Sequence, residues 1–167
     1  MDRALIHVKH PFEPVWNSES EILILGSFPS VKSREEKFFY GHPRNRFWTV
    51  LSRLLGVEAP TDIENKKAML LSHHIALWDV IAECDIYGSA DSSIKNAVPN
   101  DIKFIIENSD IRHIFTNGAT ADRLYNKYIF PTTGIPAMRL PSTSPANAAK
   151  SVDNLVKEWT ITVDSLR

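Results

Sequence analysis

Four short apolar runs predict β-strands at residues 22–25, 75–80, 113–116 and 137–140. Between them, apolar side chains recur every three or four residues, which is typical of helices with one buried face. Strands that alternate with helices predict a parallel sheet that is covered on both faces. We therefore expect an α/β fold.

The helical patterns lie at residues 45–55, 66–73, 101–108 and 118–128, and a last apolar stripe runs from Val152 to Trp159. Gly56 is placed to end the first helix, because glycine readily takes the left-handed conformation found there. Thr61 and Glu64 have the spacing of a capping box and predict the start of the second helix. We expect residues 5–15, with their two X-Pro pairs, to be extended, either as an edge strand or across the surface.

Three loops leave the carboxyl ends of predicted strands, at residues 26–44, 117–118 and 141–147. The carboxyl ends of parallel strands meet at one edge of the sheet, and ligands bind at that edge in such folds. The first loop is also long, and long loops within compact domains are usually functional. We expect a binding site where the three loops converge.

The chain has 167 residues and a formal net charge of -1, which fits one domain over residues 1–167. Any attraction for phosphate must therefore come from a local patch. Cys84 is the one cysteine in the sequence, which excludes an internal disulfide and a Cys-rich metal site; we expect it to be buried.

The first residues lack the apolar segment of a signal peptide, and no apolar run approaches the roughly 20 residues that span a bilayer. We expect a soluble, cytoplasmic protein with no membrane partner.

Residues 32–48, which include most of the first loop, carry a basic and aromatic patch. Five cations are interleaved with rings there: Lys32, Arg34, Lys37, Arg44 and Arg46 with Phe38, Phe39 and Tyr40. Cations bind phosphates and flat rings stack on bases, which is what a single strand or a flipped base needs. We expect residues 40–45 to be functional and Asn45 also to cap the helix that follows. The more buried rings are expected to anchor the core: Phe38, Phe39, Phe47 and Trp48.

The third loop, Pro141-Ser-Thr-Ser-Pro-Ala-Asn147, is stiffened by two prolines and is rich in hydroxyl groups. Such a turn can hold a phosphate on hydroxyls and free N–H groups. The alternative is an ordinary turn from strand to helix, capped by Ser144 or Asn147. Its expected place at the same edge as the first loop favours the functional interpretation.

Two further signals are weak. Residues 26–33 almost spell a phosphate-binding P-loop, but Val31 stands where the second glycine is needed and Pro29 removes a backbone N–H. Asp79 would be the only candidate for the acidic residue of a nucleotide hydrolase. His73 and His74 would point about 100° apart on a helix, and we expect no metal site.

Several long motifs together resemble the uracil-DNA glycosylase superfamily, and most closely its hypoxanthine (deoxyinosine) DNA glycosylase branch. They are Gly26-Ser-Phe-Pro-Ser30, Tyr40-Gly-His-Pro-Arg-Asn-Arg-Phe-Trp48 and the turn at residues 141–147, supported by His10-Pro-Phe-Glu-Pro14, residues 75–80 and Gly88-Ser-Ala-Asp91. The resemblance runs from about residue 5 to about residue 160. It implies a three-layer α/β/α sandwich whose four parallel strands have the order 2-1-3-4. It also implies a DNA repair glycosylase that needs no cofactor and leaves an abasic site.

The resemblance further implies roles for individual residues. The position after the first-strand glycine, which handles the hydrolytic water in most of the superfamily, is Ser27 here, and an asparagine of the His-Pro-Arg-Asn motif, Asn45, is expected to serve in its place. Backbone groups near Gly26 and Phe28 would hold the base, Tyr40 would stack on it, and Asn117 would contribute from the second loop. Arg44, Arg46 and the turn formed by Ser142, Thr143 and Ser144 would bind DNA phosphates.

The substrate implied is DNA with a deaminated base, hypoxanthine first and uracil as an alternative, bound by a monomer. Two other functions stay open. Because a serine hydroxyl is a poor base, Ser27 is also compatible with a non-catalytic nucleic-acid-binding module on the same fold. A hydrolase that acts on a small phosphate-bearing molecule would present a similar edge.

Overall fold

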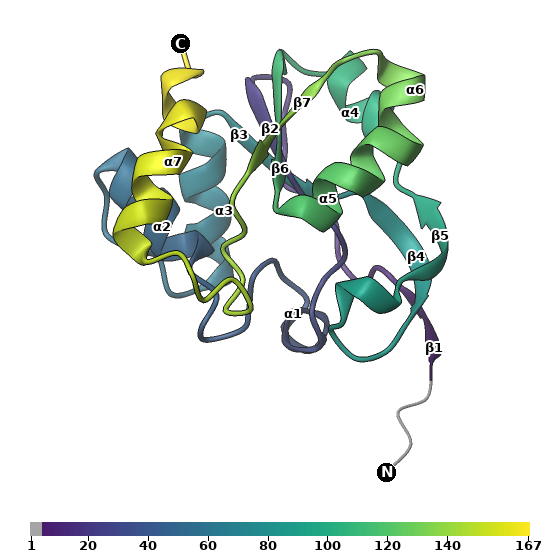
Figure 1. The fold of residues 1–167 in the computed structure, drawn as a ribbon. Coiled ribbons are helices and arrows are strands. Elements are labelled where there is room, and N and C mark those ends of the chain that lie inside the picture. Colours follow the sequence, from purple (N-terminus) through teal and green to yellow (C-terminus); the bar gives the residue numbers. More distant parts are fainter. Residues whose placement is uncertain (1–4) are drawn as a thin grey trace.

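The computed structural model describes residues 5–167 and has a parallel sheet at its centre (Figure 1). Four strands form this sheet in the order β3-β2-β6-β7: β2 (Ile22–Gly26), β3 (Ile75–Asp79), β6 (His113–Asn117) and β7 (Ala137–Leu140). Numbered along the chain within the sheet, this is the predicted order 2-1-3-4. Every residue of β2 and β3 is buried, as expected of parallel strands that are covered on both faces.

Helices cover both faces of this sheet and make the three layers that were predicted. Figure 1 shows α2 (Phe47–Leu55), α3 (Ile63–Ser72) and α7 (Val152–Asp164) on one side of it. On the other side lie α4 (Ile102–Glu107), α5 (Ala119–Leu124), the π-helical turn η2 (Tyr125–Ile129) and α6 (Phe130–Thr133). Within residues 5–167, no helix is long and apolar enough to cross a membrane. The absence of a signal peptide was inferred partly from residues 1–4, which lie outside the described part of the chain.

A second, antiparallel sheet was not predicted. It consists of β1 (Ile6–Lys9), β4 (Ile81–Ile86) and β5 (Lys95–Pro99) in the order β1-β4-β5. The chain passes from β3 into β4 with only Val80 between them, because the N–H groups of Val80 and Ile81 turn to the carbonyls of Gly26 and Ser27. The loop from β4 to β5 carries a short 3₁₀ turn, η1 (Asp91–Ser93), back toward the edge of the parallel sheet.

The ends of several elements differ from the prediction for local reasons. The long first loop contains a helical turn, α1 (Val31–Glu36), whose N-cap is Ser30. Asn45 lies one residue before the N-cap of α2, which is Arg46, although its side chain still accepts from the N–H of Phe47 at 3.0 Å. The cap of α3 is Asp62, not Thr61, with its carboxylate accepting from Asn65. Gly56 ends α2 in the left-handed conformation, as predicted.

The hydrophobic core contains the rings that were expected to anchor the first loop, since Phe38, Phe39, Phe47 and Trp48 are all at most 7% exposed. The indole N–H of Trp48 donates to the carbonyl of Phe39 at 3.1 Å. Cys84 is buried as well. These contacts fix the start and the end of residues 38–48, so that the residues between them are held in place at the edge of the sheet.

Candidate active site

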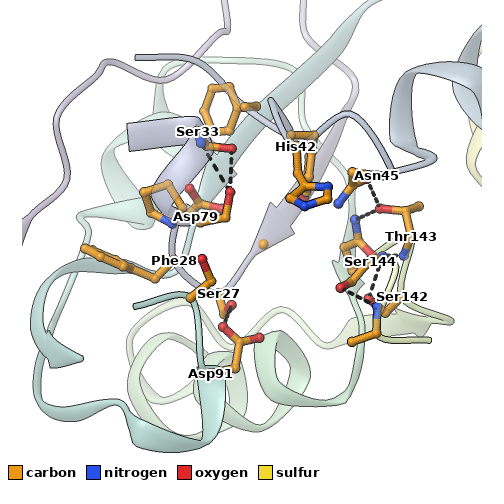
Figure 2. A pocket seen from close by; sticks show the side chains of 18 of the residues that line it. Ser27, Phe28, Ser33, His42, Asn45, Asp79, Asp91, Ser142, Thr143 and Ser144 are labelled. Atoms are coloured by element: carbon orange, nitrogen blue, oxygen red, sulfur yellow. Dashed lines mark hydrogen bonds between the residues drawn. The ribbon is translucent and has the colours of Figure 1, made fainter. Parts of the chain in front are cut away.

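A cavity of about 380 Å³ opens at the carboxyl edge of the parallel sheet, within the usual size range of small-ligand sites. Figure 2 shows Asn45 and the turn of Ser142, Thr143 and Ser144 on one side of it, with Ser27 and Asp91 on the other. All three predicted loops contribute. Of the residues that were predicted for the site, the cavity is lined by Gly26, Ser27, Phe28, Tyr40, Asn45, Asn117, Ser142, Thr143 and Ser144.

A directed chain of hydrogen bonds fixes the amide groups on one side of the cavity. The backbone N–H of Thr143 donates to Asn117 Oδ1 at 3.0 Å, so Asn117 Nδ2 must be the atom that donates to the Thr143 hydroxyl, also at 3.0 Å. That hydroxyl donates onward to Asn45 Oδ1 at 2.8 Å. Thr143 is fully buried, and buried polar networks of this kind rigidify a site when every member is satisfied.

The orientation of Asn45 follows from this chain. Its Oδ1 accepts two hydrogen bonds, from the Thr143 hydroxyl and from the N–H of Phe47. A backbone N–H can only donate, so the amide cannot be flipped without losing that bond. Nδ2 is therefore the polar atom that Asn45 offers to the cavity, and it can only donate.

Arg46 joins the first and third loops. Its guanidinium donates to the carbonyls of Ser144 and Asn147, both at 2.9 Å, and to those of Thr143 and Lys150. Its donors are used within the protein, and Arg46 does not line the cavity. These contacts hold the turn in place, and the phosphate-binding role expected for Arg46 stays a prediction.

The guanidinium of Arg44, unlike that of Arg46, makes no hydrogen bond with the third loop. It is exposed, and only its backbone N–H makes a hydrogen bond, to His42 Nδ1 at 3.0 Å. Within residues 5–167, its guanidinium has no hydrogen-bond or ion-pair partner. Arg44 directly precedes Asn45, which lines the cavity. Its guanidinium is therefore available to a phosphate near the cavity.

Tyr40 is held in an uncommon conformation at the floor of the cavity. Its φ of 54° is left-handed, which non-glycine residues adopt at a cost of about 1–3 kcal/mol, most often at functional sites. Its ring stacks on Phe47, with centroids 4.3 Å apart. Burial raises the pKa of the phenol above its ordinary value, and the Asp79 carboxylate adds to this effect. Within the described chain, the hydroxyl is buried without a hydrogen-bond partner.

Gly26 is required where the first strand meets the cavity. A Cβ atom on this residue would lie 2.4 Å from Asp79 Oδ1 and 3.0 Å from the Tyr40 hydroxyl. Asp79, at the end of β3, is 3% exposed. Its Oδ2 is hydrogen-bonded to His10 Nε2 at 2.7 Å. The glycine thus lets a carboxylate and a phenol approach the end of the strand.

Ser27, the residue after Gly26, is hydrogen-bonded to a carboxylate. Its hydroxyl donates to Asp91 Oδ1 at 2.9 Å, and both residues line the cavity. Burial raises the pKa of the Asp91 carboxyl, which the hydrogen bond from Ser27 partly opposes. Two carboxylates, Asp79 and Asp91, therefore face the cavity beside Ser27.

Sequence reasoning missed both of these carboxylates as site residues. Asp79 could have been found, because it follows a buried strand at the same edge as Gly26. Asp91 ends the Gly88-Ser-Ala-Asp91 motif that supports the family resemblance, but no role was expected for it, because it comes from a loop of the antiparallel sheet that was not predicted. His42 also lines the cavity; it lies within residues 40–45, which were expected to be functional, although no individual role was expected for it.

Comparison with known proteins agrees with this arrangement. The family model of the uracil DNA glycosylase superfamily matches residues 14–162. A Methanosarcina acetivorans protein named hypoxanthine DNA glycosylase is 34% identical over 154 residues, which are 91% of this chain and 96% of that protein. A Methanosarcina barkeri protein of the same name is 35% identical over 98 residues, which are 58% and 62% of the two chains.

A solution NMR structure agrees as well. It is of a Methanosarcina acetivorans protein described as a candidate uracil DNA glycosylase, and it matches with a TM-score of 0.80 at 33% identity. The match covers 95% of this chain and 97% of that one. The chain belongs to the uracil-DNA glycosylase superfamily.

Proposed function

We propose that this chain is a monofunctional DNA repair glycosylase that hydrolyses the N-glycosidic bond of a deaminated base, with hypoxanthine as its main substrate, and leaves an abasic site. One observation carries the proposal. Asn45, Tyr40 and the Ser142–Thr143–Ser144 turn, which come from separate parts of the sequence, line a single cavity of about 380 Å³. The names of the two Methanosarcina relatives support the same substrate.

The target base must leave the duplex to reach this cavity. Enzymes that act on a base pay a few kcal/mol to unstack and unpair it, and a mispaired base costs less. Tyr40 and Phe28 offer rings at the cavity for the extruded base, and stacking on an aromatic side chain is worth about 1–3 kcal/mol. The exposed Arg44 and the hydroxyls of Ser142 and Ser144 would hold the flanking phosphates, on a turn that Arg46 keeps in shape.

Asn45 would act on the leaving base. Breaking the C1′–N bond moves an electron pair onto the base, and Nδ2 of Asn45 is a donor fixed in place before the reaction. A preorganised donor of this kind can be worth about 3 kcal/mol in the transition state. The role expected from the resemblance, handling the hydrolytic water, is limited by the same geometry, because Nδ2 cannot accept the proton that the water loses.

The site is complete within one chain, which supports a monomer as the active form. We also propose that the protein acts in the cytoplasm, for which the low cysteine content is the available support.

A strand-cleavage assay tests the proposed function. A duplex with one inosine is incubated with the protein and then treated with alkali, which breaks the strand at abasic sites. Breaks at inosine are expected, with none in the matched duplex that carries adenine or guanine there. Binding of the inosine duplex without breaks would indicate a non-catalytic module, and hydrolysis of free inosine without any action on duplex would indicate a small-molecule hydrolase. Duplexes with uracil or xanthine rank the bases.

A further inference from the structure

Hydrolysis by the proposed glycosylase leaves one proton unassigned, and this inference rests on that proposed function. As the water oxygen bonds to C1′ of the sugar, a group in the site has to take a proton from it. Asn45 offers only a donor to the cavity, and the Ser27 hydroxyl is a weak base. Among the described residues that line the cavity, the carboxylates are those of Asp79 and Asp91.

Asp79 is the less available of the two. Its Oδ2 is held by His10 Nε2 at 2.7 Å, and both side chains are at most 5% exposed. Its Oδ1 lies against Gly26, 2.4 Å from where a Cβ would stand. Within residues 5–167 Oδ1 has no hydrogen-bond partner, but the Asp79 side chain is only 5% exposed, which leaves a water less room beside it than beside the half-buried Asp91.

Asp91 has one oxygen occupied and one free. Ser27 donates to Oδ1 at 2.9 Å, and within residues 5–167 Oδ2 has no hydrogen-bond partner, although it is not enclosed by the protein. The carboxyl group of Asp91 is therefore oriented by Ser27, the residue after Gly26, and keeps one oxygen available as an acceptor. Both residues line the cavity, and Figure 2 shows them side by side.

The loop that carries Asp91 is hydrogen-bonded to the first loop at the cavity. Arg34 donates to the carbonyl of Gly88 at 3.1 Å and to that of Pro29 at 2.9 Å, which joins the two loops. The N–H of Val31 donates to the Ser89 hydroxyl at 2.9 Å. Three separate contacts, counting the one with Ser27, thus set the position of this carboxylate, which is what a catalytic group on a loop requires.

We propose that Asp91 is the general base of the reaction, positioned by Ser27. The water oxygen forms a bond to C1′ while the electron pair of the C1′–N bond leaves with the base, and the water proton passes to Asp91 Oδ2. The departing base takes a proton from solvent, and Asp91 passes the water's proton to solvent, which restores the carboxylate. On the opposite side of the cavity, Asn45 Nδ2 meets the charge that develops on the base.

The electrostatic surroundings of Asp91 suit this task. Burial raises its pKa, Asp79 raises it further, and the Ser27 hydroxyl and Arg123 oppose the rise. Burial raises the pKa of Tyr40 and of Cys84, and the charge of Asp91 raises both further. Both groups therefore stay neutral at neutral pH. A base is more effective when its pKa moves toward the working pH.

The test is single-turnover excision of hypoxanthine from an inosine duplex by Asp91→Asn, measured across pH. Asparagine keeps an oxygen for Ser27 but cannot accept the proton, and we expect a loss of about 100-fold or more. The wild-type rate should rise with pH as the Asp91 carboxyl ionises and then level off. The midpoint of this rise should lie above about 4, the ordinary pKa of an aspartate, because the pKa of Asp91 is raised. The rise should be absent from the variant. Duplex binding should be unchanged or tighter, because a negative charge near the phosphates is removed.

Three further variants separate the roles. Asp110→Asn removes the same charge at the opposite edge of the sheet and should leave the rate unchanged. Ser27→Ala should cost less than Asp91→Asn and keep the pH-dependent rise, since Ser27 only positions the base. Asp91→Ala should regain part of its rate when formate is added, a readout that does not require the asparagine variant to fold.

The proposal is overturned if Asp91→Asn excises within threefold of the wild type, if its loss of rate is matched by a loss of binding, or if Asp79→Asn, not Asp91→Asn, removes the pH-dependent rise. It is also overturned if formate gives no rescue. A wild type that binds the duplex but never excises would refute the proposed function itself, which is a different result from an active wild type with a fully active Asp91→Asn.

Discussion

The two arginines on either side of Asn45 should behave in opposite ways when each is replaced by alanine. Arg46 donates to three backbone carbonyls of the third loop and to that of Lys150 just after it, whereas only the backbone of Arg44 makes a hydrogen bond. The two changes remove the same charge and the same side chain at positions separated only by Asn45. Any difference between them therefore reports on what each guanidinium contacts.

For Arg46→Ala the expected effect is on stability. Hydrogen bonds to charged groups contribute about 1.5–3 kcal/mol each, but water can reach some of the carbonyls once the side chain is gone. We expect a loss of about 2–4 kcal/mol in the free energy of unfolding, after allowing for that hydration. For a chain of this size the melting temperature should fall by roughly 5–15 °C. Excision should fall as well, because the turn next to Asn45 loses its support.

For Arg44→Ala the expected effect is on DNA binding alone. Surface changes of this kind usually alter stability by about 0.5 kcal/mol or less. One phosphate contact contributes about 0.9 to the slope of log K against log salt, so the slope should flatten by about that amount. Calorimetric melting and salt-dependent binding of an inosine duplex measure both quantities. The reasoning is refuted if Arg46→Ala melts with the wild type while flattening the salt slope, or if Arg44→Ala leaves the slope unchanged.

Three further changes test other parts of the site. Asn45→Ala should lower single-turnover excision of hypoxanthine at least tenfold, about half the effect in kcal/mol of a strong preorganised donor, and should cost about 1–3 kcal/mol of stability because the buried Thr143 hydroxyl loses its acceptor; an unchanged rate would remove Asn45 from the mechanism. Gly26→Ala should displace Asp79 or Tyr40, because its Cβ would lie 2.4 Å from the carboxylate oxygen, and should cost about 1–3 kcal/mol of stability together with most of the activity; a fully active, equally stable variant would contradict the geometry. Asp91→Asn should melt higher than the wild type at pH 7 and lose this advantage as the pH falls below the carboxyl pKa, because a raised pKa means that the ionised form is disfavoured in the folded protein; a lower melting temperature at pH 7 would show that the charge stabilises the fold.

The features of the fold that depend on a single physical effect could be predicted from the sequence. The central strand β2 and its neighbour β3 are largely apolar runs because both of their faces are covered. The order of the four strands and the meeting of their loops at one edge follow from the family resemblance and from parallel geometry. The convergence of Asn45, Tyr40 and the turn near Thr143 was predictable for that reason.

Other features depend on contacts that no local pattern reveals. The strand β4 was missed because its polar residues are only half-buried and it follows β3 without a turn, and with it the loop that brings Asp91 to Ser27. The basic character of Arg46 indicated a phosphate contact, but the carbonyls it binds lie about a hundred residues further along the chain. Hydrogen-bond direction at Asn45 likewise depends on Thr143, from another loop.

The central claim, that the cavity between Asn45 and Asp91 accepts a flipped hypoxanthine and releases it by hydrolysis, is tested most directly by detecting the product. An inosine duplex is incubated with excess protein, and free hypoxanthine is measured by mass spectrometry. We expect one hypoxanthine released for each inosine, with an abasic site left in the strand. Tight binding of the duplex with the inosine intact, or release of inosine as a nucleoside, would contradict the account.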